Sequence, residues 1–232
     1  MTRRWVKEEL RKNPIRDFIV KVIKYFRDNK NYFYIALAIV AVIGLFIFVT
    51  VRNRREANRD ASLIYAEAQD AVSRFNYERA IERLEQIETA YGNTKVVDQA
   101  LYLKAQVFYK RGDMEQAAVI LKDAVDRYSK SKIKPEMLVM LGSAYENLQR
   151  YDMAEASYIR IKEESYLYPE ALSGMARIKY EQENIQEAIN LYTRVASHFT
   201  GTYWGDKAKE ILAHLGVKPQ VEPEDIPALN LR

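Results

Sequence analysis

An uncharged apolar run of twenty residues dominates the hydrophobic pattern of the chain. It extends from Tyr32 to Val51, and a helix of that length is about 30 Å long, which is the thickness of the hydrocarbon layer of a bilayer. A buried soluble helix with this composition would need a much larger domain around it. The run therefore predicts a transmembrane helix at residues 32–51.

Basic residues on both sides of this run indicate a retained anchor rather than a cleaved leader. About thirty residues precede the run, more than the amino-terminal part of a signal peptide contains, and Arg52, Arg54 and Arg55 follow it. Between Pro14 and Lys30, apolar residues recur at spacings of one, three and four with basic residues between them. This pattern favours an amphipathic juxtamembrane helix within a basic tail, residues 1–31, and a solvated helix is the alternative.

The distribution of positive charge predicts the orientation of the membrane helix. Four basic residues lie within about fifteen positions of each end of the run, and the remainder of the tail adds six more. Because cytoplasmic flanks carry the excess of Lys and Arg, we expect the tail in the cytoplasm and the rest of the chain outside it. The equal charge at the two boundaries leaves the reverse orientation open.

Residues 56–215 have helical periodicity and repeat themselves four times. Four segments superpose, beginning at Phe75, Gly112, Gln149 and Glu183. The sixth residue of each segment is an alanine, and successive alanines are separated by 37, 37 and 34 residues. A period of this length is typical of helix-turn-helix repeats, so the pattern predicts an all-α domain.

This pattern resembles the tetratricopeptide repeat family, whose unit has 34 residues and small side chains where its two helices cross. The small positions of both helices are Ala68, Ala80, Ala105, Ala117, Gly142, Ala154, Ala176 and Ala188, and large residues follow the second-helix alanines at Leu84, Leu121, Tyr158 and Tyr192. Lys179 is a departure, because the family has a large aromatic residue there. The resemblance implies an α-solenoid of about four repeats, and the amphipathic segment Trp204–Leu215 is expected to cap it.

The two ends of the chain differ in character from the repeats. The segment after Gly216 contains three prolines and no period, which predicts a disordered Pro-rich tail at residues 216–232. Residues 1–55 hold 13 of the 36 basic and 4 of the 32 acidic side chains, so the repeats and the tail are together net acidic. A nucleic-acid-binding domain would carry positive charge on the folded part, and we therefore expect no nucleic-acid partner.

The sequence contains no arrangement of residues that indicates catalysis. It has no cysteine, and its two histidines, His198 and His214, stand 16 positions apart, which does not match a zinc site. It also lacks a glycine-rich phosphate loop and a serine elbow, and many carboxylates lie one helical turn from Lys or Arg. We expect a non-enzymatic protein without cofactor or metal, and a paired-carboxylate hydrolase is the alternative that sequence leaves open.

In the tetratricopeptide repeat family, the first helices of the repeats line a concave face that binds protein partners. The resemblance places the following residues on that face: Tyr65, Gln69, Tyr102, Gln106, Tyr109, Lys110, Ser143, Glu146, Asn147, Arg177 and Tyr180. Tyrosine supplies a large contact area with a polar tip, as in protein-binding hot spots. The alternative is that some of these tyrosines only pack between helices.

The order of a basic tail, one membrane pass and a short repeat array resembles the YfgM-type family, an ancillary subunit of the bacterial SecYEG translocon. This resemblance implies a scaffold in the bacterial inner membrane whose repeats face the periplasm and recruit translocon subunits, envelope chaperones or client polypeptides. One alternative is a tether that coordinates another envelope complex, in cell-wall synthesis, division or outer-membrane assembly. A cytoplasm-facing docking platform, if the orientation is reversed, and self-association of the acidic solenoid are also open.

Overall fold

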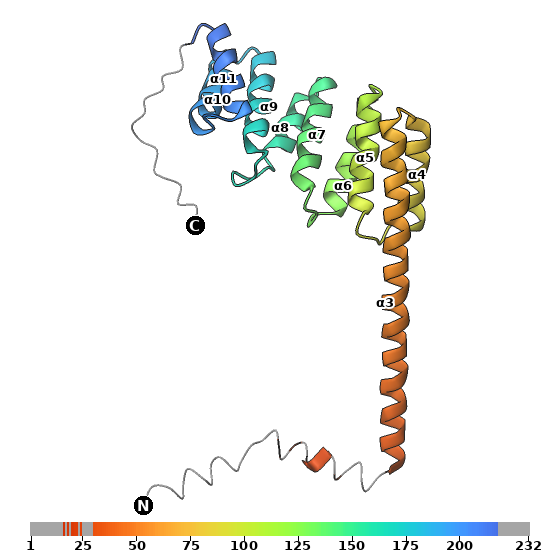
Figure 1. Cartoon of the computed structure of the whole chain (residues 1–232). Helices are drawn as coiled ribbons and strands as arrows, with labels where there is room; N and C mark the ends of the chain where they lie inside the picture. Colours follow the sequence, from red (N-terminus) through yellow and green to blue (C-terminus); the bar gives the residue numbers. More distant parts are fainter. Residues whose placement is uncertain (1–15, 17, 19, 23, 25–29, 218–232) are drawn as a thin grey trace, which may run out of the picture. The chain divides into compact units, whose positions relative to one another are not determined.

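A computed structural model describes residues 16, 18, 20–22, 24 and 30–217 of the chain (Figure 1). Most of the amphipathic helix predicted at Pro14–Lys30 lies outside the described residues, as does the predicted tail from residue 218 onward. The chain divides into two compact units, residues 1–57 and 58–232. Each unit is considered by itself.

The first unit contains the apolar part of helix α3 (Lys30–Ser73). Within the described residues, α3 is the one helix that is long and apolar enough to cross a membrane, by length and composition, with a mean hydropathy of 2.8 over its most apolar stretch. None of that stretch is buried by other parts of the protein. The sequence predicted a membrane helix and a separate first repeat helix, and α3 contains both because no Gly or Pro interrupts residues 45–73.

The second unit is a solenoid of antiparallel helices that follow one another in chain order (Figure 1). After the last turns of α3, its helices are α4 (Tyr77–Ala90), α5 (Val97–Lys110), α6 (Met114–Arg127), α7 (Lys134–Asn147), α8 (Tyr151–Tyr158), α9 (Tyr168–Glu181), α10 (Ile185–His198) and α11 (Tyr203–His214). The part of the chain that the structure describes contains no strand. The fold is therefore the all-α repeat solenoid that the periodicity predicts, with α11 after the fourth hairpin.

Each helical hairpin turns through one residue with left-handed backbone geometry. The φ angles are 59° at Phe75, 83° at Gly112, 56° at Gln149 and 61° at Glu183, and these residues open the four superposed segments. In every turn the next N–H donates to a carbonyl five residues earlier, as Asn184 N–H does to Lys179 O at 2.8 Å. This is the Schellman arrangement of helix ends, and one of the four positions is glycine.

The small positions of both helices lie where the helices meet. The seven alanines among them, Ala68, Ala80, Ala105, Ala117, Ala154, Ala176 and Ala188, are fully buried, and Gly142 is buried as well. The large residues that follow the second-helix alanines are also buried, with Tyr158 only 1 % exposed. Each alanine lets two backbones approach closely, so that the hairpins stack into one continuous core.

The third hairpin is irregular. Its second helix, α8, has 8 residues, whereas α6 has 14. The loop that follows α8 spans residues 159–167, compared with residues 128–133 after α6. The 34-residue spacing between Ala154 and Ala188 therefore arises from a shortened helix and a lengthened loop.

Lys179 departs from the repeat pattern because it makes a polar contact between helices. Its Nζ lies 2.8 Å from Glu155 Oε2 on α8, and the two side chains are 15 % and 27 % exposed. Both the hydrogen bond and the charge of Glu155 raise the pKa of Lys179, against a smaller opposing effect of burial. A half-buried ion pair thus joins the third and fourth hairpins where the family has an aromatic side chain.

Candidate functional site

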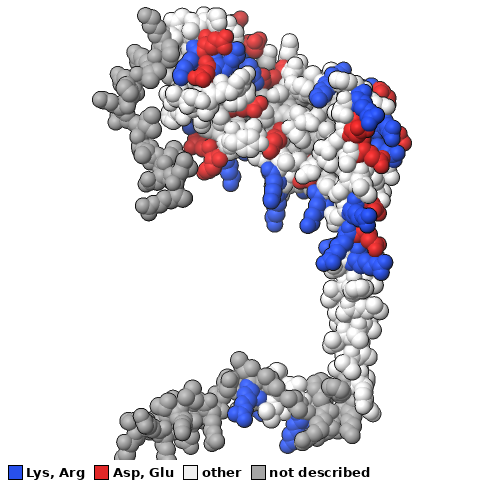
Figure 2. Space-filling model, viewed as in Figure 1, with Lys and Arg blue, Asp and Glu red and all other residues white. Residues whose placement is uncertain are grey.

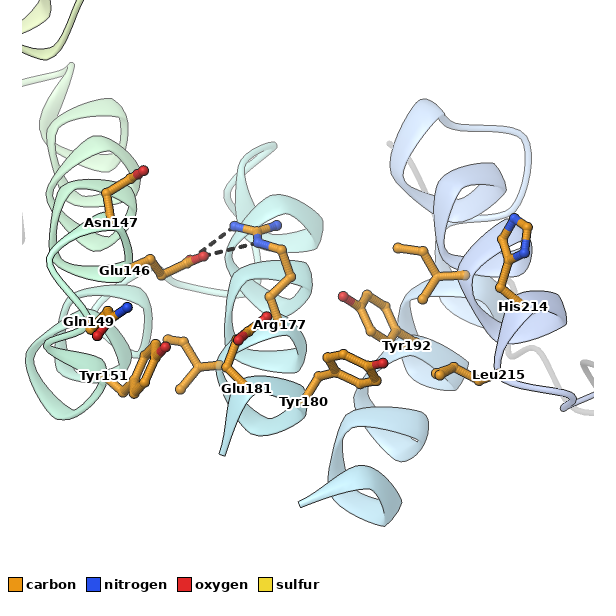
Figure 3. A pocket seen from close by; sticks show the side chains of 12 residues that line it. Glu146, Asn147, Gln149, Tyr151, Arg177, Tyr180, Glu181, Tyr192, His214 and Leu215 are labelled. Carbon is orange, nitrogen blue, oxygen red and sulfur yellow. Dashed lines mark hydrogen bonds and ion pairs between the residues drawn. The ribbon is translucent and has the colours of Figure 1, made fainter. Parts of the chain in front are cut away.

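A groove of about 550 Å³ opens between α7, α9, α10 and α11 (Figure 3). We call it the C-terminal groove. Figure 3 shows Glu146, Arg177 and Tyr151 toward α7 and α9, and Tyr192, His214 and Leu215 toward α10 and α11. The residues that line it are Glu146, Asn147, Gln149, Tyr151, Arg177, Ile178, Tyr180, Glu181, Tyr192, Ile211, His214 and Leu215.

An ion pair between α7 and α9 forms the charged side of the C-terminal groove (Figure 3). Arg177 Nε donates to Glu146 Oε2 and Arg177 Nη2 to Glu146 Oε1, both at 3.0 Å. The Glu146 side chain is 17 % exposed and that of Arg177 is 41 % exposed. Two parallel hydrogen bonds fix the relative position of the two groups more tightly than one point contact does. The pair therefore holds the first helices of repeats three and four in register beside the groove.

Tyr158 of α8 contacts the glutamate of this ion pair. Its hydroxyl donates to Glu146 Oε1 at 2.5 Å and lies 3.2 Å from Ser143 Oγ. Burial, followed by the nearby Glu146 carboxylate, raises the pKa of Tyr158 well above its usual range. The phenol therefore remains a hydrogen-bond donor at neutral pH and helps to fix Glu146 in place.

Two glycines make room for the Tyr158 ring. A Cβ on Gly142 of α7 would lie 2.5 Å from Cε1 and Cζ of the ring, and a Cβ on Gly174 of α9 would lie 2.5 Å from Cε2 and Cζ. Real carbon–carbon contacts are about 3.5–4.0 Å. The ring is thus enclosed from both sides, and either alanine would force it out of its present position.

The aromatic side of the C-terminal groove offers surface to a ligand. Tyr180 is 46 % exposed, whereas Tyr192 is 3 % exposed and forms part of the groove wall. Ile211 and Leu215 of the capping region lie on the same side, partly buried. Half-exposed rings and aliphatic side chains beside a fixed charge pair are characteristic of sites that bind polypeptide segments.

A smaller hollow of about 260 Å³ lies among α5, α7 and α9, and we call it the central hollow. Asn147 connects the two sites, because its Nδ2 donates to the Tyr109 hydroxyl at 3.0 Å. Near this hollow the Tyr166 hydroxyl donates to Glu136 Oε1 at 2.6 Å, and this bond raises the pKa of Tyr166 to about 12. The lining residues are Tyr102, Tyr109, Glu136, Val139, Met140, Ser143, Leu167 and Glu170.

The residues predicted for the concave face fall into three groups. Those in the C-terminal groove are Glu146, Asn147, Arg177 and Tyr180, and those in the central hollow are Tyr102, Tyr109 and Ser143. The other four residues line neither of these two sites: Tyr65, Gln69, Gln106 and Lys110. In this third group Tyr65 is partly buried, and burial raises the pKa of its hydroxyl.

Sequence reasoning did not find several residues of the C-terminal groove. Ile211, His214 and Leu215 were assigned only a capping role, and Tyr192 only a packing role. One signal was present: Tyr158 and Tyr192 are aromatic and polar where the first two repeats have leucine. Gly174 carried another signal, because the corresponding positions of the two preceding repeats are Leu103 and Met140.

The described residues contain no group of three or more His, Asp or Glu side chains that could hold a metal ion. Several carboxylates near the two sites interact with neighbouring groups or are partly buried. Glu146 pairs with Arg177, Glu136 accepts from Tyr166, and burial raises the pKa of Glu170. The arrangement is suited to binding a polypeptide.

Comparison with solved structures shows that the fold of this protein is that of tetratricopeptide-like repeats. It resembles the crystal structure of nearly identical TPR-like repeats of a "putative kinesin light chain" from Podosopora anserina, with a TM-score of 0.54, 15 % identity, and coverage of 68 % of this chain and 85 % of the other. A single-substitution variant of that protein gives a TM-score of 0.55 and 16 % identity, with the same coverage of 68 % and 85 %. At such identities the likeness concerns the fold alone.

The sequence family is more specific. Residues 57–217 match the YfiO family, described as "Outer membrane lipoprotein", and the chain belongs to this family. No curated protein matches the chain. Tetratricopeptide repeat folds typically serve as non-enzymatic scaffolds for protein interactions.

Proposed function

We propose that this protein is a membrane-anchored, non-enzymatic scaffold that binds polypeptide partners in the C-terminal groove. The observation that carries the proposal is the groove itself, in which the Glu146–Arg177 ion pair and the half-exposed Tyr180 line the same hollow. A rigid polar contact would orient a partner segment, and the aromatic surface would supply contact area. The tyrosines and glutamines predicted on the concave face of the first two repeats, including Tyr65 and Gln69, would extend the binding surface beyond the groove.

The proposed anchor is the apolar run at residues 32–51. Its length and hydropathy suit a membrane span, and the basic tail favours a cytoplasmic N-terminus. The family description, "Outer membrane lipoprotein", supports a periplasmic position for the repeat domain, residues 56–215. The proposed attachment is therefore the apolar helix, inserted in the inner membrane.

The proposed partners are translocon subunits, envelope chaperones or client polypeptides, as the YfgM-type resemblance implies. The family description supports a second candidate, a tether that coordinates another envelope complex such as outer-membrane assembly. The two functions use the same groove and differ in the partner that fills it. Identification of that partner separates them.

Site-specific photocrosslinking in intact cells tests the groove directly. A photoreactive phenylalanine at Tyr180 faces the C-terminal groove, and one at the exposed Lys122 of α6 serves as the control outside it. We expect the Tyr180 probe to capture translocon subunits or envelope chaperones. Capture of components of another envelope complex would favour the second function, and equal capture by both probes would refute binding in the groove.

The membrane orientation requires a separate test. The chain has no native cysteine, so single cysteines at Thr2 and at the exposed Asp152 are unique labelling sites. We expect a membrane-impermeant maleimide added to spheroplasts to label Asp152→Cys but not Thr2→Cys. The reverse result would place the repeats in the cytoplasm and replace the proposal by a cytoplasmic docking platform.

A further inference from the structure

One edge of the repeat unit surrounds the point where the chain enters it at Asn58. The backbone N–H of Lys95 donates to Asn58 Oδ1 at 2.8 Å, which places the loop of residues 91–96 beside that point. The loop of residues 128–133 follows, because Ser131 Oγ donates to Asp98 Oδ2 at 2.6 Å in the first turn of α5. We call Asn58 with these two loops the Asn58 edge.

The Asn58 edge carries lysines without internal counterions. Lys95, Lys130 and Lys132 are exposed, and within the described residues none of them has a hydrogen-bond or ion-pair partner for its side chain. A hollow of about 480 Å³ lies between the two loops, with Lys95 and Lys130 in its lining. The one carboxylate that lines it, Asp98, already accepts hydrogen bonds from Ser131 and from the Gln99 N–H.

The opposite edge, formed by the four left-handed turns, has a different charge arrangement. Two of its arginines are paired with carboxylates: Arg111 lies 3.4 Å from Glu78 and Arg150 lies 2.9 Å from Glu115. Figure 2 shows Lys and Arg side chains that project from the loop side of the solenoid, away from those turns. Three lysines without a partner among the described residues thus lie together at the Asn58 edge, whereas ion pairs neutralise Arg111 and Arg150 of the opposite edge.

The covalent chain limits how far this edge can lie from the proposed membrane span. Asn58 follows Val51, the last residue of the apolar run, by seven residues. Even a fully extended segment of that length reaches only about 25 Å. A bilayer that holds residues 32–51 would therefore keep its headgroups within reach of the Asn58 edge.

We propose that the Asn58 edge docks on an anionic lipid surface, with Lys95, Lys130 and Lys132 contacting the headgroup phosphates. This inference rests on the proposed membrane insertion of residues 32–51. A lysine near an anionic surface favours binding by about fivefold, so three lysines together favour the docked state by about a hundredfold at low salt. Screening beyond about 8 Å in physiological salt reduces this preference.

Fluorescence quenching on the full chain tests the docking. A single cysteine at Ser129, an exposed residue that lines the hollow, carries the fluorophore, and the protein is reconstituted into vesicles whose lipids bear a headgroup quencher. We expect strong quenching in vesicles that contain phosphatidylglycerol, and weak quenching in phosphatidylcholine alone or at high salt. The matched control is a fluorophore at Asp152→Cys near the opposite edge, which should remain unquenched in every vesicle.

Charge variants identify the groups responsible. Replacing Lys95, Lys130 and Lys132 by glutamine should reduce the quenching at Ser129→Cys to the level of the Asp152→Cys control, whereas replacing them by arginine should preserve it. Equal quenching in neutral vesicles, or an unchanged signal in the glutamine variant, would overturn the proposal. Flotation of the same samples separates the two hypotheses: protein that floats but is unquenched refutes docking alone, and protein that does not float refutes membrane insertion.

Discussion

Substitution of Gly174 by alanine should destabilise the repeat domain, although this change usually stabilises a helix. Alanine is favoured over glycine by about 1 kcal/mol in a helix interior. Here the new Cβ would lie 2.5 Å from two carbons of the Tyr158 ring, roughly 1 Å inside an ordinary contact. The ring cannot retreat, because Gly142 limits it in the same way on its other side.

The magnitude follows from these opposing effects. Overpacking of a dense core typically costs about 1–3 kcal/mol, and the helix preference offsets about 1 kcal/mol of it. We expect Gly174→Ala to lower the free energy of unfolding by up to about 2 kcal/mol, which shifts the melting temperature down by about 2–4 °C for each kcal/mol. Urea denaturation of the full chain in mild detergent, followed by circular dichroism, measures the change.

The same substitution in a protein that lacks the Tyr158 ring makes the test decisive. The first two repeats have Leu84 with Leu103, and Leu121 with Met140, where the third has Tyr158 with Gly174. In a Tyr158→Leu background the enclosed ring is absent, so Gly174→Ala should stabilise by about 0.5–1 kcal/mol. The helix preference is common to both backgrounds, so the two mutations should be coupled by the overpacking cost of about 1–3 kcal/mol. If Gly174→Ala stabilises the protein that retains Tyr158, or has the same effect in both backgrounds, the steric account is wrong.

Three further predictions concern the turns, a titration and a helix crossing. Gln149→Gly should stabilise by about 0.5–1 kcal/mol because φ is 56° there, and Gly112→Ala should destabilise by about 1–2 kcal/mol, both measured by urea denaturation. Burial raises the pKa of Tyr158 above its ordinary value of 10.0, so the folded chain keeps a proton that the unfolded chain releases. The stability that this proton provides is complete below about pH 10 and is lost above it, and Tyr158→Phe should reduce the alkaline slope by as much as about 1.4 kcal/mol per pH unit. Ala154→Leu should overpack its crossing and lower the unfolding free energy by about 1–3 kcal/mol, whereas Ala156→Leu, at an exposed position of the same helix, should change it little.

The periodic features of the fold could be predicted from sequence because they depend on local spacing. Ala80, Ala117, Ala154 and Ala188 marked the second helices, and the segments that contain them begin at the left-handed turn residues. The length of α8 could not be predicted in this way. The spacing of 34 residues is the same whether a repeat has a full helix and a short loop or a short helix and a long loop.

The candidate site was only partly predictable, for a different reason. Glu146 and Arg177 were placed on one face by their positions within the repeats, but Tyr158, which contacts Glu146, comes from α8, and its ring fits between a glycine of α7 and a glycine of α9. Gly174 is separated from Tyr158 by a loop, so no helical periodicity relates them. The sequence does contain a larger residue at Tyr158 together with a smaller one at Gly174, where the earlier repeats have two large residues. This exchange can be recognised once the repeats have been aligned.

The short α8 also has a consequence for how the repeat array melts. A helix of 8 residues is too short to be stable without its neighbours, and in a linear array each repeat is coupled only to the next. Cooperativity should therefore be weakest at α8, so that the helices before it and those after it open as two blocks. The C-terminal groove spans this junction, with Asn147 on one side and Leu215 on the other. A polypeptide bound there would join the two blocks, and occupancy of the groove would be coupled to the opening of the array as a whole.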